Sequence, residues 1–188
     1  FLPNLEFFFS KTKKIYENFF FLPFINKRGM KHQAICVFHG KINGTVRFKT
    51  VRRGVQVKVK LQGLSPGGHG FHVHKNGDMS AKHCAGGCEH FNPYGNVHGG
   101  RSSVNRHVGD LGNIYANSRG MVEETFVDSK ISLSFTSKAC ILGRMLIVHA
   151  GEDDLGLYDG KSEKKQKASL ETGNSGKRIG CGIIGIIE

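Results

Sequence analysis

Apolar and polar residues alternate along several short stretches of this chain, a pattern typical of strands that are buried on one side. The clearest stretch is 54–63, where an apolar residue stands at every second position from Val55 to Leu61 and lysine or glutamine stands between them. Further candidate strands are 33–40, 44–51, 70–74, 112–117, 120–127, 130–135, 139–150 and 181–187. Helix signals are weak throughout, so the pattern predicts an all-β, antiparallel sandwich or barrel.

Two long stretches between these candidate strands, 75–111 and 150–180, are irregular. Loops of this length in a compact domain are usually functional. The first loop, together with the strand before it, carries most of the histidines of the chain.

Composition agrees with a strand-and-turn protein, because the 188 residues include 26 glycines, four prolines and no tryptophan. The length allows one domain, or one domain plus an extension. The formal charge of +12 and the pI near 9.7 suit nucleic acid, an acidic surface or a small anionic substrate as the partner. A merely solvated basic surface is the alternative.

Residues 1–29 differ in composition from the rest of the chain, with eight of the fourteen phenylalanines. The apolar run 19–25 is too short to cross a bilayer and contains Pro23, so no transmembrane segment is expected. No small-residue cleavage site of a signal peptide follows it. We expect 1–29 to be an extension, disordered or an artefact of the gene model, and 30–188 to be the folded domain. A targeting or membrane-touching segment is the alternative for 1–29.

Histidines cluster densely between positions 69 and 110. His72 and His74 are two apart, so a strand would place both rings on one face, where they could bind one ion. Taken alone, this pair is weak evidence for a metal site, because two such histidines are more commonly ordinary surface residues. His107 and Asp110 offer an imidazole and a carboxylate three residues apart, which suits zinc. With His90, His98 and His149 the candidate histidines outnumber the ligands of one four-coordinate metal, so two metals or a shared ligand follow.

Several separate motifs resemble one family, the copper/zinc superoxide dismutases, over about Cys36 to Ile187. They are GFHVHKNGD, GCEHFNPYGNVHGG, RHVGDLGN, ILGRMLIVH, DDLG and TGNSGKRIGCGIIGI. The resemblance implies a Greek-key β-sandwich or barrel of about eight antiparallel strands with two long functional loops. It also implies an enzyme that dismutates superoxide to dioxygen and hydrogen peroxide, with a redox-cycling copper and a structural zinc.

The same resemblance implies the role of each site residue. The implied copper ligands are His72, His74, His90 and His149. The implied zinc ligands are His90, His98, His107 and Asp110. His90 would thus bridge both ions and deliver protons, while Asp153 would orient one histidine on each side and Arg178 would attract and position superoxide. Thr172 would narrow the channel.

Cys84 and Cys181 correspond to the disulfide of the family, which leaves three of the five cysteines. Cys36 and Cys140 lie in apolar, strand-like runs and are expected to be buried thiols. Cys88 is not part of the family pattern, and the sequence leaves open whether it competes for the disulfide or stays free.

The chain departs from the family pattern in three places. The loop 155–171 is longer than usual, and its segment 161–167 is rich in lysine, which would attract an anion or contact a polyanion. His83 belongs to an insertion and is expected to be exposed. Asn76 stands where an aromatic residue is common, so the expected homodimer, with isoleucines 183, 184, 186 and 187 in its contact, could be weakened.

Two other classes of function compete with the enzyme. One is the dismutase-like domain of a copper chaperone, which loss of a copper ligand or a terminal CxC would favour; His149 is present and there is no CxC. The other is a basic polyanion-binding protein. A copper chaperone is also a candidate partner. We expect a cytoplasmic protein, with an extracellular location as the alternative.

Overall fold

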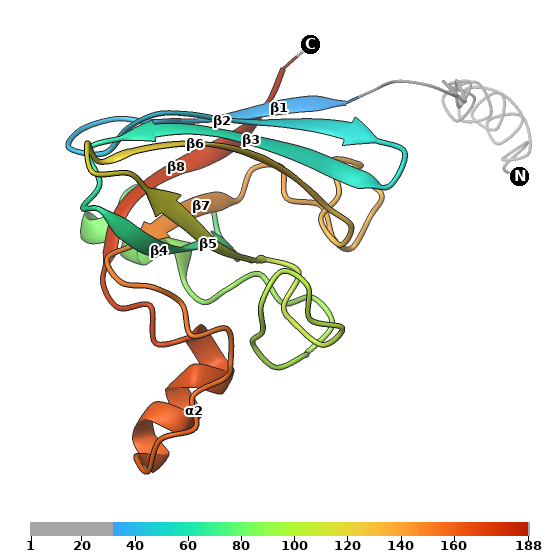
Figure 1. Ribbon diagram of the computed structural model, residues 1–188. Helices are drawn as coiled ribbons and strands as arrows, with labels where there is room; N and C mark the ends of the chain where they lie inside the picture. Colours follow the sequence, from blue (N-terminus) through green and yellow to red (C-terminus); the bar gives the residue numbers. More distant parts are fainter. Residues whose placement is uncertain (1–31, 188) are drawn as a thin grey trace, which may run out of the picture. The chain divides into compact units, whose positions relative to one another are not determined.

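The computed structural model describes residues 32–187, and the expectations for 1–29 lie outside the described residues. Eight strands form the domain (Figure 1). They are β1 (Gln33–Phe38), β2 (Asn43–Val51), β3 (Gly54–Gln62), β4 (Gly67–His74), β5 (Asp110–Ala116), β6 (Met121–Asp128), β7 (Met145–His149) and β8 (Arg178–Ile187). Two helical segments lie in the long loops, the 3-10 turn η1 (Lys82–Gly87) and the helix α2 (Glu163–Thr172).

The strands follow the predicted alternation, since Val55, Val57, Val59 and Leu61 of β3 are buried and Lys58 and Lys60 between them are exposed. All strand pairs are antiparallel, in the order β5-β4-β7-β8-β1-β2-β3-β6. Neighbours such as β4 and β7, or β1 and β8, are far apart in sequence, as in Greek-key connections. The predicted all-β Greek-key barrel of eight antiparallel strands is confirmed.

The barrel is not hydrogen-bonded between its two edge strands, β5 and β6. A tight turn joins them, in which Gly120 N–H donates to the Asn117 carbonyl at 2.9 Å. Arg101 spans the seam, because its Nε donates to the Leu111 carbonyl in β5 at 2.9 Å and its guanidinium lies 3.5 Å from the ring centre of Phe126 in β6. This side chain therefore links the long loop 75–109 to both edges of the sheet.

A buried ion pair between Arg106 and Asp128 anchors the same loop. Arg106 Nη2 lies 2.5 Å from Asp128 Oδ2, and the two side chains are 1% and 0% exposed. Nη1 of Arg106 also donates to the carbonyls of His107, Val108 and Asp110. Because the arginine holds the backbone on both sides of Gly109, it fixes the end of the loop against β6.

Three expectations about local structure were wrong. Residues 163–172 form α2 rather than irregular loop: the Ser162 hydroxyl caps the first turn by accepting from Lys165 N–H, and Gly173, with φ at 69°, ends the helix. The segment 130–135 is not a strand and has only one isolated bridge, from Ser132 to Cys140. Of the segment 139–150, only β7 is a strand.

Replacing Asp128 by asparagine is expected to lower the free energy of unfolding by about 3–5 kcal/mol, because it leaves the Arg106 charge buried without a counter-ion. Urea unfolding of the variant, beside the exposed-site control Asp159→Asn, measures this. An unchanged unfolding midpoint would contradict the anchoring role of the pair.

Candidate metal centre

The centre is built where β4 lies between β5 and β7. His72 and His74 occupy alternate positions in β4, while Phe71 and Val73, which alternate with them, belong to the barrel core. Both β4 histidines therefore point out of the barrel, under the long loops. His149 ends β7.

Two of these ligand positions coincide with irregularities in the sheet. The register of β4 against β5 shifts between Gly70 and His72. The register of β7 against β8 shifts between Val148 and His149. Since a bulge turns a side chain away from the regular alternation of the sheet, these shifts re-aim the two rings toward the same point.

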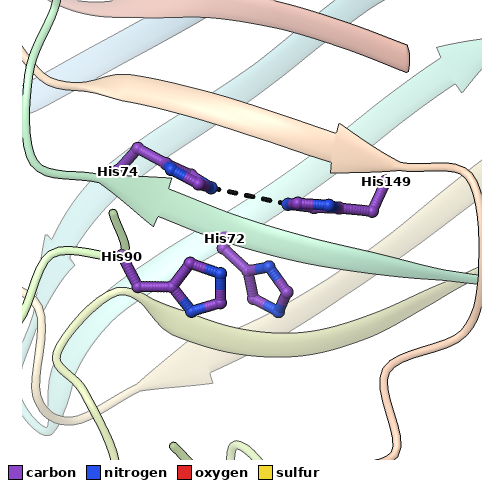
Figure 2. A group of neighbouring side chains, drawn as sticks. All are labelled: His72, His74, His90 and His149. Carbon is purple, nitrogen blue, oxygen red and sulfur yellow. Dashed lines mark hydrogen bonds between the residues drawn. The ribbon is translucent and has the colours of Figure 1, made fainter. Parts of the chain in front are cut away.

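Four imidazoles form the first group, with one candidate ligand nitrogen each within 4.8 Å of the others (Figure 2). Its members, all buried, are His72, His74, His90 and His149. Nε2 of His74 and Nε2 of His149 face each other at 3.4 Å. The rings of His72 and His90 lie side by side, with centres 4.1 Å apart.

Three imidazoles and a carboxylate form the second group, again within 4.8 Å of one another. Its members, all buried, are His90, His98, His107 and Asp110. The Nδ1 atoms of the three rings converge on one atom, Asp110 Oδ1, at 2.9 to 3.1 Å. His90 is a member of both groups.

The donor set fits metal ions. Imidazole nitrogens with a carboxylate oxygen are the ligands that zinc and copper prefer. Within the described residues, His72 Nδ1 and His90 Nε2 are buried and have no hydrogen-bond partner. A buried polar atom without a partner is costly, and a metal ion at the first group would satisfy both nitrogens.

Asp153 connects the two groups. Its Oδ2 lies 2.8 Å from His72 Nε2 and its Oδ1 lies 2.8 Å from His98 Nε2. The side-chain amide of Asn113 in β5 holds the backbone of this aspartate. Its Nδ2 donates to the Asp153 carbonyl and its Oδ1 accepts from the Asp153 N–H, each at 2.8 Å. Gly173, which ends α2, packs so closely that a Cβ there would lie 1.7 Å from Asp153 Oδ1. The carboxylate is therefore fixed from both sides.

Burial sets the charge states of the rings. Burial, with the neighbouring His90 as a further cause, lowers the pKa of His72 to about 3 and that of His149 to about 4. The pKa of His98 is instead raised to about 9, because hydrogen bonds to Asp110 and Asp153 outweigh burial. Rings that stay neutral near pH 7 keep a free electron pair for a metal.

The two carboxylates respond in the opposite direction. Burial alone would favour their neutral forms, yet hydrogen bonds from the histidines hold the pKa of Asp110 and that of Asp153 below their usual range. Both therefore remain ionised, which keeps two negative charges beside the cluster.

Arg178 lies beside the first group, at the start of β8. Its Nη1 donates to the Cys84 carbonyl at 2.8 Å, and its Nη2 donates to the Cys88 carbonyl. The Cys88 carbonyl also accepts from His74 Nδ1 at 2.9 Å. Arg178 lines an open surface hollow, whose other lining residues are His83, Ala85, Gly176 and Lys177.

The predicted disulfide between Cys84 and Cys181 is confirmed, and it fastens η1 to β8 next to Arg178. Cys88 is a free, exposed thiol, which answers the question that the sequence left open. Cys36 is buried as expected, and burial raises the pKa of its thiol, whereas Cys140 is only half-buried.

The remaining expected positions are less central. His83 is exposed, as predicted. Thr172 is exposed at the end of α2, and its hydroxyl donates to the Ala168 carbonyl at 3.0 Å rather than lining the hollow of Arg178.

Sequence reasoning missed three contributors. Asn113 is an isolated asparagine in a strand and belongs to no recognisable motif. Cys88 contributes its backbone carbonyl, which has no signature in the sequence. His69 is fully buried, with Nδ1 2.8 Å from the His149 carbonyl and Nε2 2.8 Å from the Ser65 carbonyl. Its place in the histidine-rich stretch was the only available signal.

Replacing Asp153 by asparagine is expected to weaken metal binding by about 10- to 100-fold, because an amide cannot accept from both His72 and His98. Competition of the purified protein against a chelator measures the affinity. The exposed Asp159→Asn variant serves as the control, and equal affinities for the two variants would contradict the orienting role.

The metal-free protein should lose stability as the pH falls from about 6.5 to about 4. An unfolded histidine takes up a proton near pH 6.5, whereas folded His149 does so only near pH 4, so the unfolded state binds more protons in this window. The shift corresponds to up to about 3 kcal/mol for this one ring. Urea midpoints across the window measure the slope, and His149→Gln should flatten it.

Comparison with known proteins points to a single family. The family model described as copper/zinc superoxide dismutase (SODC) matches residues 42–184. A superoxide dismutase [Cu-Zn] of Paramecium bursaria Chlorella virus 1 is 50% identical over 153 residues, which are 81% of this chain and 77% of the relative. The extracellular superoxide dismutase [Cu-Zn] of Brugia pahangi is 44% identical over 156 residues, 81% of this chain and 75% of the relative.

A superoxide dismutase [Cu-Zn] of Onchocerca volvulus is 43% identical over 160 residues, 84% of this chain and 98% of the relative. Among solved structures, the crystal structure of the clock protein EA4 superposes with a TM-score of 0.77 and 40% identity, covering 85% of this chain and 97% of that one. The chain therefore belongs to the copper/zinc superoxide dismutase family.

Proposed function

We propose that this protein dismutates superoxide to dioxygen and hydrogen peroxide. The observation that carries the proposal is the pair of ligand groups that share His90, with complete donor sets on both sides. The relatives named as Cu-Zn superoxide dismutases, at 43 to 50% identity, support it.

The first group would hold copper and the second would hold zinc. A four-imidazole set suits copper, and a set of three imidazoles with a carboxylate suits zinc. His90 Nδ1 already faces Asp110, while its Nε2 lies among the rings of the first group without a partner in the described residues. His90 is therefore the ligand that would bridge the two ions.

Copper held by the first group would supply the one-electron redox chemistry that dismutation requires. The residues of the chain bind, orient and supply protons. Arg178 presents a guanidinium beside His74 and His149, where it attracts and positions the anion, and Lys177 adds charge to the same hollow. His90 Nε2 is positioned to hold and release a proton. Asp153 keeps His72 and His98 in the orientation that binding requires.

The finer assignments are also proposals. Thr172 would restrict the channel, although its hydroxyl is committed to the helix. A homodimer would use β8, where Ile186 is exposed and Ile183 and Ile187 are half-buried, but not Ile184, which is fully buried in the core. The exposed Asn76 would contribute little to that contact. A copper chaperone would deliver the metal, and residues 30–188 would form the enzymatic domain.

Location and polyanion contact have separate support. The described residues include no helix that is long and apolar enough to cross a membrane. A cytoplasmic location is proposed because only one disulfide forms and the other three cysteines are free thiols. Secretion is the alternative, because one relative is named as extracellular. The exposed lysines of 161–167, on and before α2, are the proposed contact for a polyanionic chain.

Stopped-flow measurement of superoxide decay, with protein loaded with copper and zinc, tests the activity. Fast decay that is lost in His149→Ala is expected, since this removes one of four copper ligands. Background decay from protein that has bound both metals would overturn the proposal and favour the chaperone domain or the polyanion-binding protein.

Arg178→Ala should slow the decay by about tenfold or more and weaken its dependence on salt, because the anion is no longer attracted to the hollow. Arg178→Lys retains the charge and should restore part of the rate. Equal rates for Ala and Lys variants would contradict a role of the charge.

A further inference from the structure

Exposed cations gather on the outward side of β2 and β3, away from the metal centre. We define the basic sheet face by its members Arg47, Lys49, Arg52, Arg53, Lys58 and Lys60, all of them exposed. Arg47 of β2 lies directly opposite Lys58 of β3. Arg52 and Arg53 form the turn that joins the two strands, at the end nearest Lys49.

Only one of these six charges has an ion-pair partner within the described residues. Lys60 forms an ion pair of 2.6 Å with Glu123 of β6, and no other ion pair of the described chain includes a member of the face. Like charges directly opposite each other on a sheet are destabilising. The inward residues of the same strands, such as Phe48 and Val57, already form the core, so packing does not require the cations.

The neighbouring strands extend the face without adding negative charge near its centre. Ile35 of β1 lies opposite Arg47, and Thr125 of β6 lies opposite Lys58. The outward positions of β1 and β6 that flank the cations are Gln33, Ile35, Val37, Met121, Glu123, Thr125 and Val127. None is aromatic, so the face offers no ring on which the bases of a single-stranded nucleic acid could stack.

We propose that the basic sheet face binds the anionic surface of a lipid bilayer. A bilayer surface would meet all six cations together with the exposed apolar Val37 and Val127 on the flanking strands, whereas a polyanion lying along β2 and β3 would meet the cations alone. Clusters of four to eight lysines and arginines are typical of contacts with anionic lipid headgroups. The broad strand surface, rather than a groove, is what such a partner requires.

The fold would then hold the metal centre away from the lipid. In Figure 1, β1, β2, β3 and β6 form one layer, and α2 lies on the other side of the barrel. The metal-centre histidines come from β4, β7 and the long loop that precedes β5. A protein bound through the basic sheet face would leave the hollow of Arg178 open to solution.

Co-sedimentation of the metal-loaded, full-length chain with vesicles tests this. Vesicles of phosphatidylcholine with phosphatidylserine should bind the protein at low salt, and vesicles of phosphatidylcholine alone should not. The double variant Arg47→Gln/Lys58→Gln should weaken binding by about tenfold or more. The matched control Lys82→Gln/Lys138→Gln, with the same loss of charge at exposed positions outside this face, should retain it.

Two results would overturn the proposal. One is the absence of binding to phosphatidylserine vesicles at low salt, including the case in which the protein binds duplex DNA or a sulfated polysaccharide instead. The other is an equal loss in both double variants, which would assign the binding to net charge. Vesicle binding is measured without reference to dismutase activity. The lipid-binding proposal can therefore fail while the proposed reaction holds, and the reverse.

A second measurement separates loss of the surface from loss of the fold. Arg47→Gln/Lys58→Gln removes a pair of like charges, so its melting temperature at low salt should equal or exceed that of the parent protein. A lower melting temperature would mean that the two cations support the fold, and the proposal would fail.

Discussion

The arrangement of the metal centre depends on two buried carboxylates. Asp110 and Asp153 are both fully buried, and each would be costly there without donors. Asp110 Oδ1 meets three imidazole Nδ1 atoms, and Asp153 holds one ring from each ligand group. Because Asp153 faces Nε2 of His72, the Nδ1 of that ring is left free in a defined direction, and Asp110 leaves Nε2 of His90 free in the same way. The two carboxylates therefore preorganise the rings, and hydrogen bonds from the rings in turn stabilise the buried carboxylates.

This mutual dependence explains why both long loops must be tied to the barrel. The first loop is held at its end by Arg106 and Asp128, and in its middle by the disulfide from Cys84. The second loop is held at two points. The Asn113 side chain donates to the Asp153 carbonyl, and the backbone N–H of His98 donates to the Leu170 carbonyl of α2 at 2.8 Å. Arg106 directly precedes the ligand His107, and His98 is itself a ligand. The first loop supplies three of the seven candidate ligands, and strands of the barrel supply the other four.

Much of this could be predicted from residue types and spacing. Strand alternation predicted the barrel, and a histidine pair in one strand predicted rings on one face. The helix α2 was missed because it has no apolar face, so hydrophobic periodicity cannot detect it, although Ser162 and Gly173 are good capping residues. The Cys88 carbonyl, which holds both His74 and Arg178, could not have been found, because a backbone acceptor has no signature in the sequence.

The strong positive charge of the chain has different effects at different places. Two layers of a barrel pack about 10 Å apart, and exposed charges are screened over about 8 Å at physiological salt. The cations of β2 and β3 therefore contribute little to the field at the hollow of Arg178, where Lys177 acts directly. Net charge alone would assign all the lysines to attraction of the substrate. Their placement instead separates Lys177, which lines the hollow of Arg178, from the cations on the outward side of β2 and β3.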